Sequence, residues 1–252
     1  MFFSVLRAGE WGRGAEFELY CRGDTASPIN KFHVKHLTVK NEYDKIDIVR
    51  KRGRRTVMNR IFYIIGKSSS GKDSVYKRLL SELKLTPIVL YTTRPMRENE
   101  QEGREYHFVS RDCFEKMKSS GDVIEERKYN TVHGEWIYFT ARNSIDIKRG
   151  SCLGIGTLES YVKIRENFGS AVVPIYIEVE DGLRLSRALE RERLEAMPKY
   201  AELCRRFLAD SEDFSEENIK SAGIEKRFSN DGAMEDCISE ITEYINEILA
   251  KS

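Results

Sequence analysis

The architecture of this chain can be inferred from one segment, Ile61-Phe-Tyr-Ile-Ile-Gly-Lys-Ser-Ser-Ser-Gly-Lys-Asp-Ser74. An apolar run enters a Gly-x-x-x-x-Gly-Lys loop, and the amphipathic segment 75–83 follows it. The glycines let the backbone turn so that several N–H groups point at one anion, with the positive end of the next helix behind them. This order of strand, loop and helix predicts a P-loop that binds the phosphates of a nucleotide.

The loop departs from the usual motif at one position. Lys72 supplies the cation that bridges the outer phosphates, but the next residue, normally Ser or Thr, is Asp73. A carboxylate is a good Mg²⁺ ligand and is favourable in the first turn of a helix, so Asp73 is the predicted metal ligand. The predicted phosphate-binding residues of the loop are Gly66, Lys67, Ser68, Ser69, Ser70, Gly71, Lys72, Asp73 and Ser74.

Composition restricts the class of protein. The 252 residues, 40% of them apolar, are enough for a buried core in one large or two small domains. Charged residues nearly cancel, leaving a net charge of +1, which argues against a nucleic-acid or membrane partner. The five cysteines lack metal-ligand spacing, and no apolar stretch approaches the roughly 18 residues that span a bilayer. We therefore expect reduced thiols and a cytoplasmic location.

From residue 58 onward, strand-like runs alternate with helix-like segments, which predicts an α/β fold with a parallel sheet flanked by helices. An irregular, aromatic-rich region, 92–140, is interpreted as a small subdomain with substrate contacts or, alternatively, as a surface β-layer. A long helical segment, 183–213, and a terminal amphipathic helix, 234–249, follow. The predicted strands are 60–65, 87–91, 152–155 and 172–179.

Residues 1–57 do not show this alternation of strand-like and helix-like segments, and near their end they contain the basic run Arg50-Lys-Arg-Gly-Arg-Arg55. One interpretation is an extension, possibly disordered, that binds an anionic partner. Another is that the run is a translated ribosome-binding site, because Lys, Arg and Gly can all be encoded by purine-only codons. Our hypothesis is that Met58 is the natural start, with one domain over 58–252; amino-terminal sequencing of the native protein would contradict it by finding upstream peptides.

A second motif, Tyr91-Thr-Thr-Arg-Pro-Met-Arg-Glu-Asn-Glu-Gln-Glu-Gly-Arg-Glu-Tyr-His-Phe-Val-Ser110, follows the second strand. Together with the P-loop, it resembles the guanylate kinase family from about Met58 to the end. The resemblance implies transfer of the γ-phosphoryl group of ATP to GMP or dGMP with Mg²⁺, a reaction of purine nucleotide metabolism. It also implies a P-loop core, a GMP-binding subdomain and a mobile helical lid, over residues 58–91, 141–182 and 215–252 (core), 92–140 (subdomain) and 183–214 (lid).

The resemblance assigns residues to the acceptor phosphate. Arg94 and Arg97 match the two family arginines that clamp the monophosphate, a task suited to a guanidinium that binds phosphate oxygens bidentately. Tyr106 would donate its hydroxyl to the same phosphate. Glu100 matches the family position that orients this loop.

The resemblance assigns base recognition to Glu125, which lies where the family places a carboxylate that accepts from both N1–H and the exocyclic amine of guanine. Tyr138 and Thr140 match a family turn after a small insertion. The chain departs from the family at Leu90, where a serine is usual, and at Gly154 and Gly156, where aspartates are usual. Two guanine-side or metal-side contacts are therefore expected to be missing.

The resemblance also covers the lid and the adenine site. Arg187 and Arg191 lie four residues apart on one helical face, and Arg191 matches a family arginine that reaches the phosphates on closure. Arg206 matches a second such arginine, and Asn230 matches an asparagine beside adenine. Such arginines neutralise charge on the transferring phosphoryl group. The predicted catalytic residues are Lys72, Arg94, Arg191 and Arg206.

Two alternatives stay open. Gly-Lys-Asp-Ser also resembles the P-loop of ribose 1,5-bisphosphate phosphokinases, which share the fold and phosphorylate a sugar phosphate. A catalytically silent guanylate-kinase-like binding module is the other alternative, disfavoured by Lys72 and the lid arginines. The sequence leaves the oligomeric state open.

Overall fold

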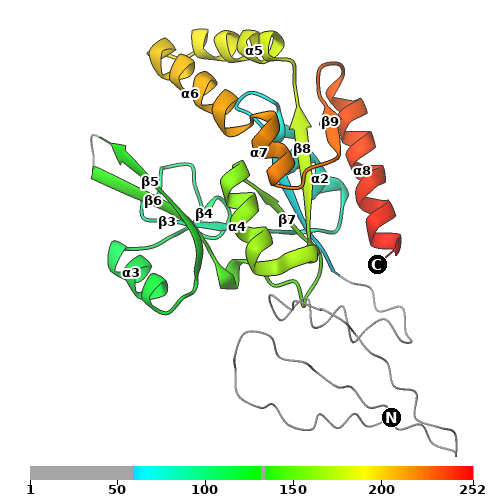
Figure 1. Cartoon of the computed structure of the whole chain (residues 1–252). Coiled ribbons are helices and arrows are strands. Elements are labelled where there is room, and N and C mark those ends of the chain that lie inside the picture. Colours follow the sequence, from blue (N-terminus) through cyan, green and yellow to red (C-terminus); the bar gives the residue numbers. More distant parts are fainter. Residues whose placement is uncertain (1–58, 132–133, 252) are drawn as a thin grey trace, which may run out of the picture. The chain divides into compact units, whose positions relative to one another are not determined.

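The computed structural model describes residues 59–131 and 134–251 (Figure 1). All of them belong to one compact unit. Our hypothesis about Met58 and the basic run at 50–55 therefore concerns residues outside the described part. Within the described residues, no helix is long and apolar enough to cross a membrane.

The core is a five-stranded sheet in which every pairing is parallel. Its central strand is fully buried, as expected of a continuous apolar run with neighbours on both sides. The predicted strands at 60–65, 152–155 and 172–179 are confirmed to within a residue, and so is the α/β class. In spatial order, the strands are β2 (Thr86–Pro87), β7 (Cys152–Ile155), β1 (Ile61–Ile65), β8 (Val172–Glu178) and β9 (Arg227–Ser229).

Helices cover both faces of this sheet because alternate residues of β1 point to opposite sides. Phe62 and Ile64 belong to an apolar cluster with helices α2 (Lys72–Glu82) and α8 (Met234–Lys251). Tyr63 belongs to the opposite cluster, with α4 (Leu158–Phe168) and α7 (Glu216–Ser221). The terminal helix predicted at 234–249 is confirmed as α8. Two short 3-10 turns complete this part, η1 (Arg142–Ser144) and η2 (Gly169–Ala171).

The region 90–131 and 134–141 contains a second, four-stranded sheet, which agrees with the alternative of a β-layer and not with an irregular region (Figure 1). Helix α3 (Arg111–Ser119) packs on one face through Phe114, against Ile137 and Phe139. In spatial order, the strands are β4 (Tyr106–Phe108), β3 (Leu90–Thr92), β6 (Gly134–Ala141) and β5 (Val123–Thr131).

The single strand predicted at 87–91 was wrong. The segment splits into β2, on the edge of the core sheet, and β3, in the second sheet. Pro87 has no N–H for a ladder and is confined to an edge, so the chain leaves the core sheet there and enters the other sheet at Leu90.

The long helical segment predicted at 183–213 is helical but interrupted. It consists of two helices, α5 (Asp181–Arg193) and α6 (Tyr200–Asp213), which Figure 1 shows as separate yellow and orange helices. Pro198 lies between them, and proline disfavours helical geometry in the residue before it. The two helices therefore pack as a pair that returns the chain to the core.

Candidate active site

The P-loop joins β1 to α2 and contains two left-handed residues, Ser69 (φ 63°) and Gly71 (φ 84°). A Cβ on Gly71 would lie 2.5 Å from the Asn230 side-chain nitrogen, and one on Gly66 would lie 2.7 Å from the Ile177 carbonyl oxygen. Both positions therefore require glycine for conformation or space. The loop delivers the first N–H groups of α2, with half-buried Lys72 and exposed Asp73 and Ser74, to one end of the core sheet.

Asn230 supports the loop from the end of β9. Its Nδ2 donates to the Ser70 carbonyl over 2.8 Å, and the residue is only 3% exposed. Arg187 of α5 donates to the Asn230 carbonyl over 3.0 Å. Asn230, which the resemblance predicts to lie beside adenine, thus connects the end of β9 to the P-loop and to α5.

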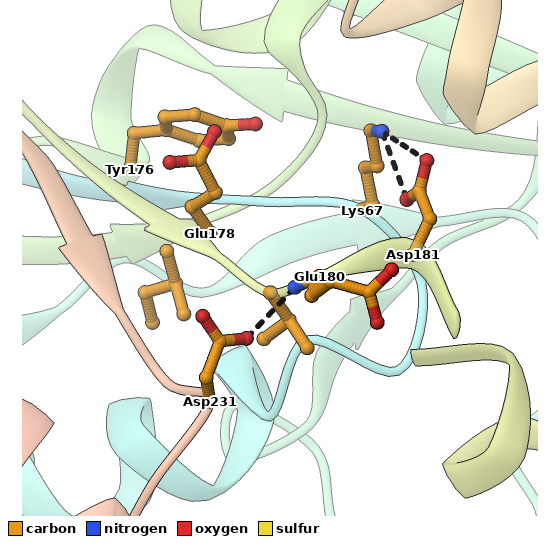
Figure 2. A pocket seen from close by; sticks show the side chains of 8 residues that line it. Lys67, Tyr176, Glu178, Glu180, Asp181 and Asp231 are labelled. Atoms are coloured by element: carbon orange, nitrogen blue, oxygen red, sulfur yellow. Dashed lines mark hydrogen bonds and ion pairs between the residues drawn. The ribbon is translucent and has the colours of Figure 1, made fainter. Parts of the chain in front are cut away.

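A cavity of about 320 Å³ opens beside the P-loop at the end of β8 (Figure 2). Lys67 faces Asp181 across it, at 3.1 Å, and Asp231 accepts from the Glu180 N–H over 2.8 Å. Four of the lining residues are acidic, and they outnumber the single lysine. Nucleotide phosphates would be repelled here, so the predicted phosphate site stays the N–H groups of the P-loop and not this cavity. The lining residues are Lys67, Tyr176, Ile177, Glu178, Val179, Glu180, Asp181 and Asp231.

Helices α5 and α6, the predicted lid, contact the P-loop through a buried arginine. Arg184 of α5 is 1% exposed, and it donates to Asp181 and to Asp210 over 3.1 Å each. Its guanidinium also lies 4.0 Å from the centre of the Phe207 ring. The Asp210 carboxylate in turn accepts from the Ser68 backbone N–H. Sequence reasoning missed Arg184 and Asp210, because 26 positions separate them and no local spacing connects α5 with α6.

The two predicted lid arginines have different environments. Arg191 donates to the Ser69 hydroxyl over 3.2 Å and therefore lies at the P-loop. Arg206 is exposed on α6 and pairs with Glu202 at 3.7 Å, on its own helix. The structure thus brings Arg191, but not Arg206, to the phosphate-binding loop.

Four of the predicted acceptor residues share one face of the second sheet. In the β5–β6 pair, Glu125 lies opposite Thr140, and Arg127 lies opposite Tyr138. Opposite residues of an antiparallel pair project to the same side, whereas the intervening Phe139 packs on α3. Tyr106 contacts Tyr138 edge to face, with ring centroids 5.4 Å apart. Four separated sequence positions, 106, 125, 138 and 140, are therefore brought together.

Arg94 is held on this face by Glu100. Its Nη1 and Nη2 donate to the two carboxylate oxygens over 2.9 and 2.7 Å, and its Nε donates to the Tyr138 hydroxyl over 3.0 Å. Glu100 also accepts from the backbone N–H of Arg97 over 2.8 Å. The hydrogen bond from Arg94 lowers the pKa of Glu100 to about 2, assisted by that from Arg97. The carboxylate therefore fixes the loop, and the Arg97 side chain is exposed beside it.

Glu125 is the most buried carboxylate of this face. Its side chain is 5% exposed and accepts from the Thr140 hydroxyl over 2.6 Å. Arg127, two residues on, has its Nε 3.2 Å from the same carboxylate. Sequence reasoning missed Arg127, although its i, i+2 spacing from Glu125 on a strand is a usable signal for a shared face.

Gly154 of β7 and Gly156, which follows that strand, make room for Tyr63. A Cβ on Gly154 would lie 2.5 Å from the Tyr63 ring, and one on Gly156 would lie 2.3 Å from its hydroxyl. That hydroxyl is 3.0 Å from the Ser160 hydroxyl, and burial raises the pKa of Tyr63 to about 12. A neutral phenol from β1 therefore fills the space into which acidic side chains at 154 and 156 would project.

The metal ligands available are few. The described residues contain no group of three or more His, Cys, Asp or Glu side chains that could hold a metal ion. Mg²⁺ in nucleotide sites is held by one or two protein ligands together with phosphates and water. The exposed Asp73 carboxylate in the first turn of α2 fits that smaller requirement.

The comparisons with known proteins identify one family. The family model described as guanylate kinase matches residues 58–226. The guanylate kinase of Nitrosomonas europaea is 38% identical over 90 residues, 35% of this chain and 43% of that protein. That of Thermotoga maritima is 31% identical over 151 residues, 59% of this chain and 62% of that protein. These matches span from under half to under two thirds of the relatives' lengths.

A solved structure shows the same fold. The crystal structure of guanylate kinase from Anaplasma phagocytophilum matches with a TM-score of 0.53 and 22% identity. The match covers 78% of this chain and 87% of that one.

Proposed function

Since this chain belongs to the guanylate kinase family, we propose that it transfers the γ-phosphoryl group of ATP to GMP or dGMP. The observation that carries the proposal is the Glu125–Thr140 pair, which lies on the sheet face that also holds Arg94. A buried carboxylate with lone pairs to spare is suited to the N1–H and 2-amino donors of guanine. Adenine has an acceptor at N1 and would be repelled.

The donor side consists of the P-loop and the lid. Lys72 and the N–H groups at the start of α2 would bind the β- and γ-phosphates of ATP. Mg²⁺, held by Asp73, would supply neutralisation of charge on the phosphate oxygens. Arg191, already hydrogen-bonded to Ser69, would add a second cation at the same loop.

The acceptor phosphate would bind beside Arg94. Glu100, Pro95 and Tyr138 accept four of the five N–H bonds that an arginine offers, so Arg94 keeps little donor capacity for a ligand. The exposed Arg97 would therefore make the main phosphate contact, while buried Arg94 and the Tyr106 hydroxyl complete it. No nucleophilic side chain is required, because phosphoryl transfer depends on in-line positioning and charge neutralisation.

A second candidate is ribose 1,5-bisphosphate as acceptor. Leu90 offers no hydrogen bond, Tyr63 takes the space of two family aspartates, and Arg127 adds a cation to the acceptor face. The missing aspartates and Arg127 favour an acceptor with more negative charge than GMP, and Leu90 removes a contact to the base. Glu125 favours GMP, because a buried carboxylate would repel a second phosphate.

The test is ADP release by the full chain with ATP and Mg²⁺, offered GMP, dGMP, AMP, UMP or ribose 1,5-bisphosphate. We expect turnover with GMP and dGMP alone. Lys72→Met should abolish it, whereas Lys77→Met, on the exposed side of α2, should not. Turnover only with the sugar bisphosphate would replace the proposal by the second candidate. No ADP release with any acceptor would favour a binding module.

A further inference from the structure

Arg127 occupies a position on the acceptor face that the proposed reaction has not used. It lies on β5, opposite Tyr138 and two residues from Glu125, so its side chain projects to the same side as both. Its side chain is 18% exposed, compared with 45% for Lys128 on the other face of the same strand. A long cationic side chain is therefore largely buried against the carboxylate predicted to read the base.

The contacts of Arg127 leave donors unused. Its Nη2 donates to Glu125 Oε1 over 3.4 Å, which is long for a hydrogen bond to a carboxylate. Its Nε is 3.2 Å from Oε2, yet among the described residues this buried atom has no hydrogen-bond partner. An arginine has five N–H donors, and Glu125 also accepts the short bond from Thr140. The guanidinium can thus donate to a ligand without abandoning Glu125.

Guanine presents a matching edge. Its N1–H and 2-amino donors lie next to the O6 acceptor, with N7 as a further acceptor on the same side, and arginine commonly reads O6 and N7. A carboxylate beside a guanidinium offers the complementary order, acceptor followed by donor. The other donor beside Glu125, the Thr140 hydroxyl, already gives its hydrogen to the carboxylate, and Leu90 has none.

We propose that Arg127 is a specificity-determining residue that donates to O6 of the acceptor base, while Glu125 accepts from N1–H and the 2-amino group. This inference rests on the proposed function. It makes the site specific for 6-oxopurines through a residue pair on one strand, in place of the serine contact that Leu90 lacks.

The test compares kcat/KM of the full chain for GMP, IMP and 6-thio-GMP. IMP lacks only the 2-amino group, and 6-thio-GMP replaces only O6 by a weaker acceptor. We expect Arg127→Met to lower kcat/KM for GMP by about tenfold or more and to shrink the preference for GMP over 6-thio-GMP. The preference for GMP over IMP, which reports on Glu125, should remain. Lys128→Met is the matched control and should leave all three values unchanged.

The outcomes separate the two claims. A wild-type chain that does not use GMP would overturn the proposed function and this inference with it. An active wild type whose Arg127→Met variant keeps or improves kcat/KM for GMP, with an unchanged 6-thio-GMP ratio, would overturn the inference alone. Calorimetric binding of GMP and 6-thio-GMP to the wild type needs no variant to fold. Equal affinities there would also contradict a donor at O6.

Discussion

The Asp210 carboxylate on α6 accepts a hydrogen bond of 2.9 Å from the backbone N–H of Ser68 in the P-loop. Arg184, 1% exposed, neutralises that carboxylate and also contacts the Ser68 carbonyl over 3.4 Å. The predicted lid is therefore attached to the P-loop by a buried ion pair as well as by Arg191. An acidic side chain takes one of the loop N–H groups.

Arg184→Met should destabilise the protein strongly, because it leaves the Asp210 carboxylate without its buried cation, whereas Asp181 keeps Lys67. Breaking a buried pair by removing one partner typically costs about 3 kcal/mol. Urea denaturation should show this as a lower midpoint than that of the wild type. Arg193→Met, exposed in the last turn of α5, should keep the wild-type midpoint. Equal midpoints for the two variants would show that the Arg184 contacts do not stabilise the fold.

Gly154→Ala should also destabilise the protein, because its new methyl group would lie 2.5 Å from the Tyr63 ring. Overpacking of this kind costs about 1–3 kcal/mol. Gly150→Ala is a suitable control, since its Cβ would meet nothing closer than 4.0 Å. In a Tyr63→Leu background the cost of Gly154→Ala should shrink. Thermal unfolding of the four variants measures this coupling, and a cost unaffected by residue 63 would contradict it.

The Arg94–Glu100 pair predicts a pH dependence of stability. The pKa of Glu100 falls from 4.5 to about 2 in the folded chain, so the pair stabilises fully above pH 4.5 and loses its effect as the pH falls towards 2. Glu100→Gln should therefore lower Tm at pH 7, and its difference from the wild type should close between pH 4.5 and 2. Glu98→Gln, exposed in the same loop, controls for the lost charge. A difference that is as large at pH 3 as at pH 7 would contradict the lowered pKa.

Asp73 predicts an unusually steep dependence of ATP affinity on Mg²⁺. Its carboxylate is a hard ligand for the metal, but without the metal it repels the γ-phosphate. Calorimetric titration with ATP over a range of Mg²⁺ concentrations should show this dependence, and Asp73→Ser should flatten it. An unchanged magnesium dependence in Asp73→Ser would remove Asp73 from the metal site.

The parallel sheet and its P-loop could be predicted because their signals are local. Continuous apolar runs marked β1, β7 and β8, and the glycine spacing marked the loop. The prediction of one strand over 87–91 failed because apolar residues continue past Pro87, whereas the chain leaves one sheet there and enters the other. Similarly, helical periodicity over 183–213 hid the break at Pro198.

The candidate site was predictable where a motif was contiguous. Arg94, Glu100 and Tyr106 lie in one short string, and the structure brings them together. Arg184 and Asp210 depend on the packing of two helices, and no sequence spacing predicts that contact. Gly154 and Gly156 leave space for Tyr63 of a neighbouring strand. The sequence therefore indicated that two aspartates are missing, but it did not indicate which side chain fills their space.

The most direct test of the account is to identify the products after the full chain is incubated with ATP, Mg²⁺ and GMP. Chromatography should show GDP and ADP in equal amounts, no ADP when AMP replaces GMP, and a loss of both products in Glu125→Gln. ADP without GDP, or equal turnover of GMP and AMP, would contradict the assignment of Glu125 as the residue that reads guanine.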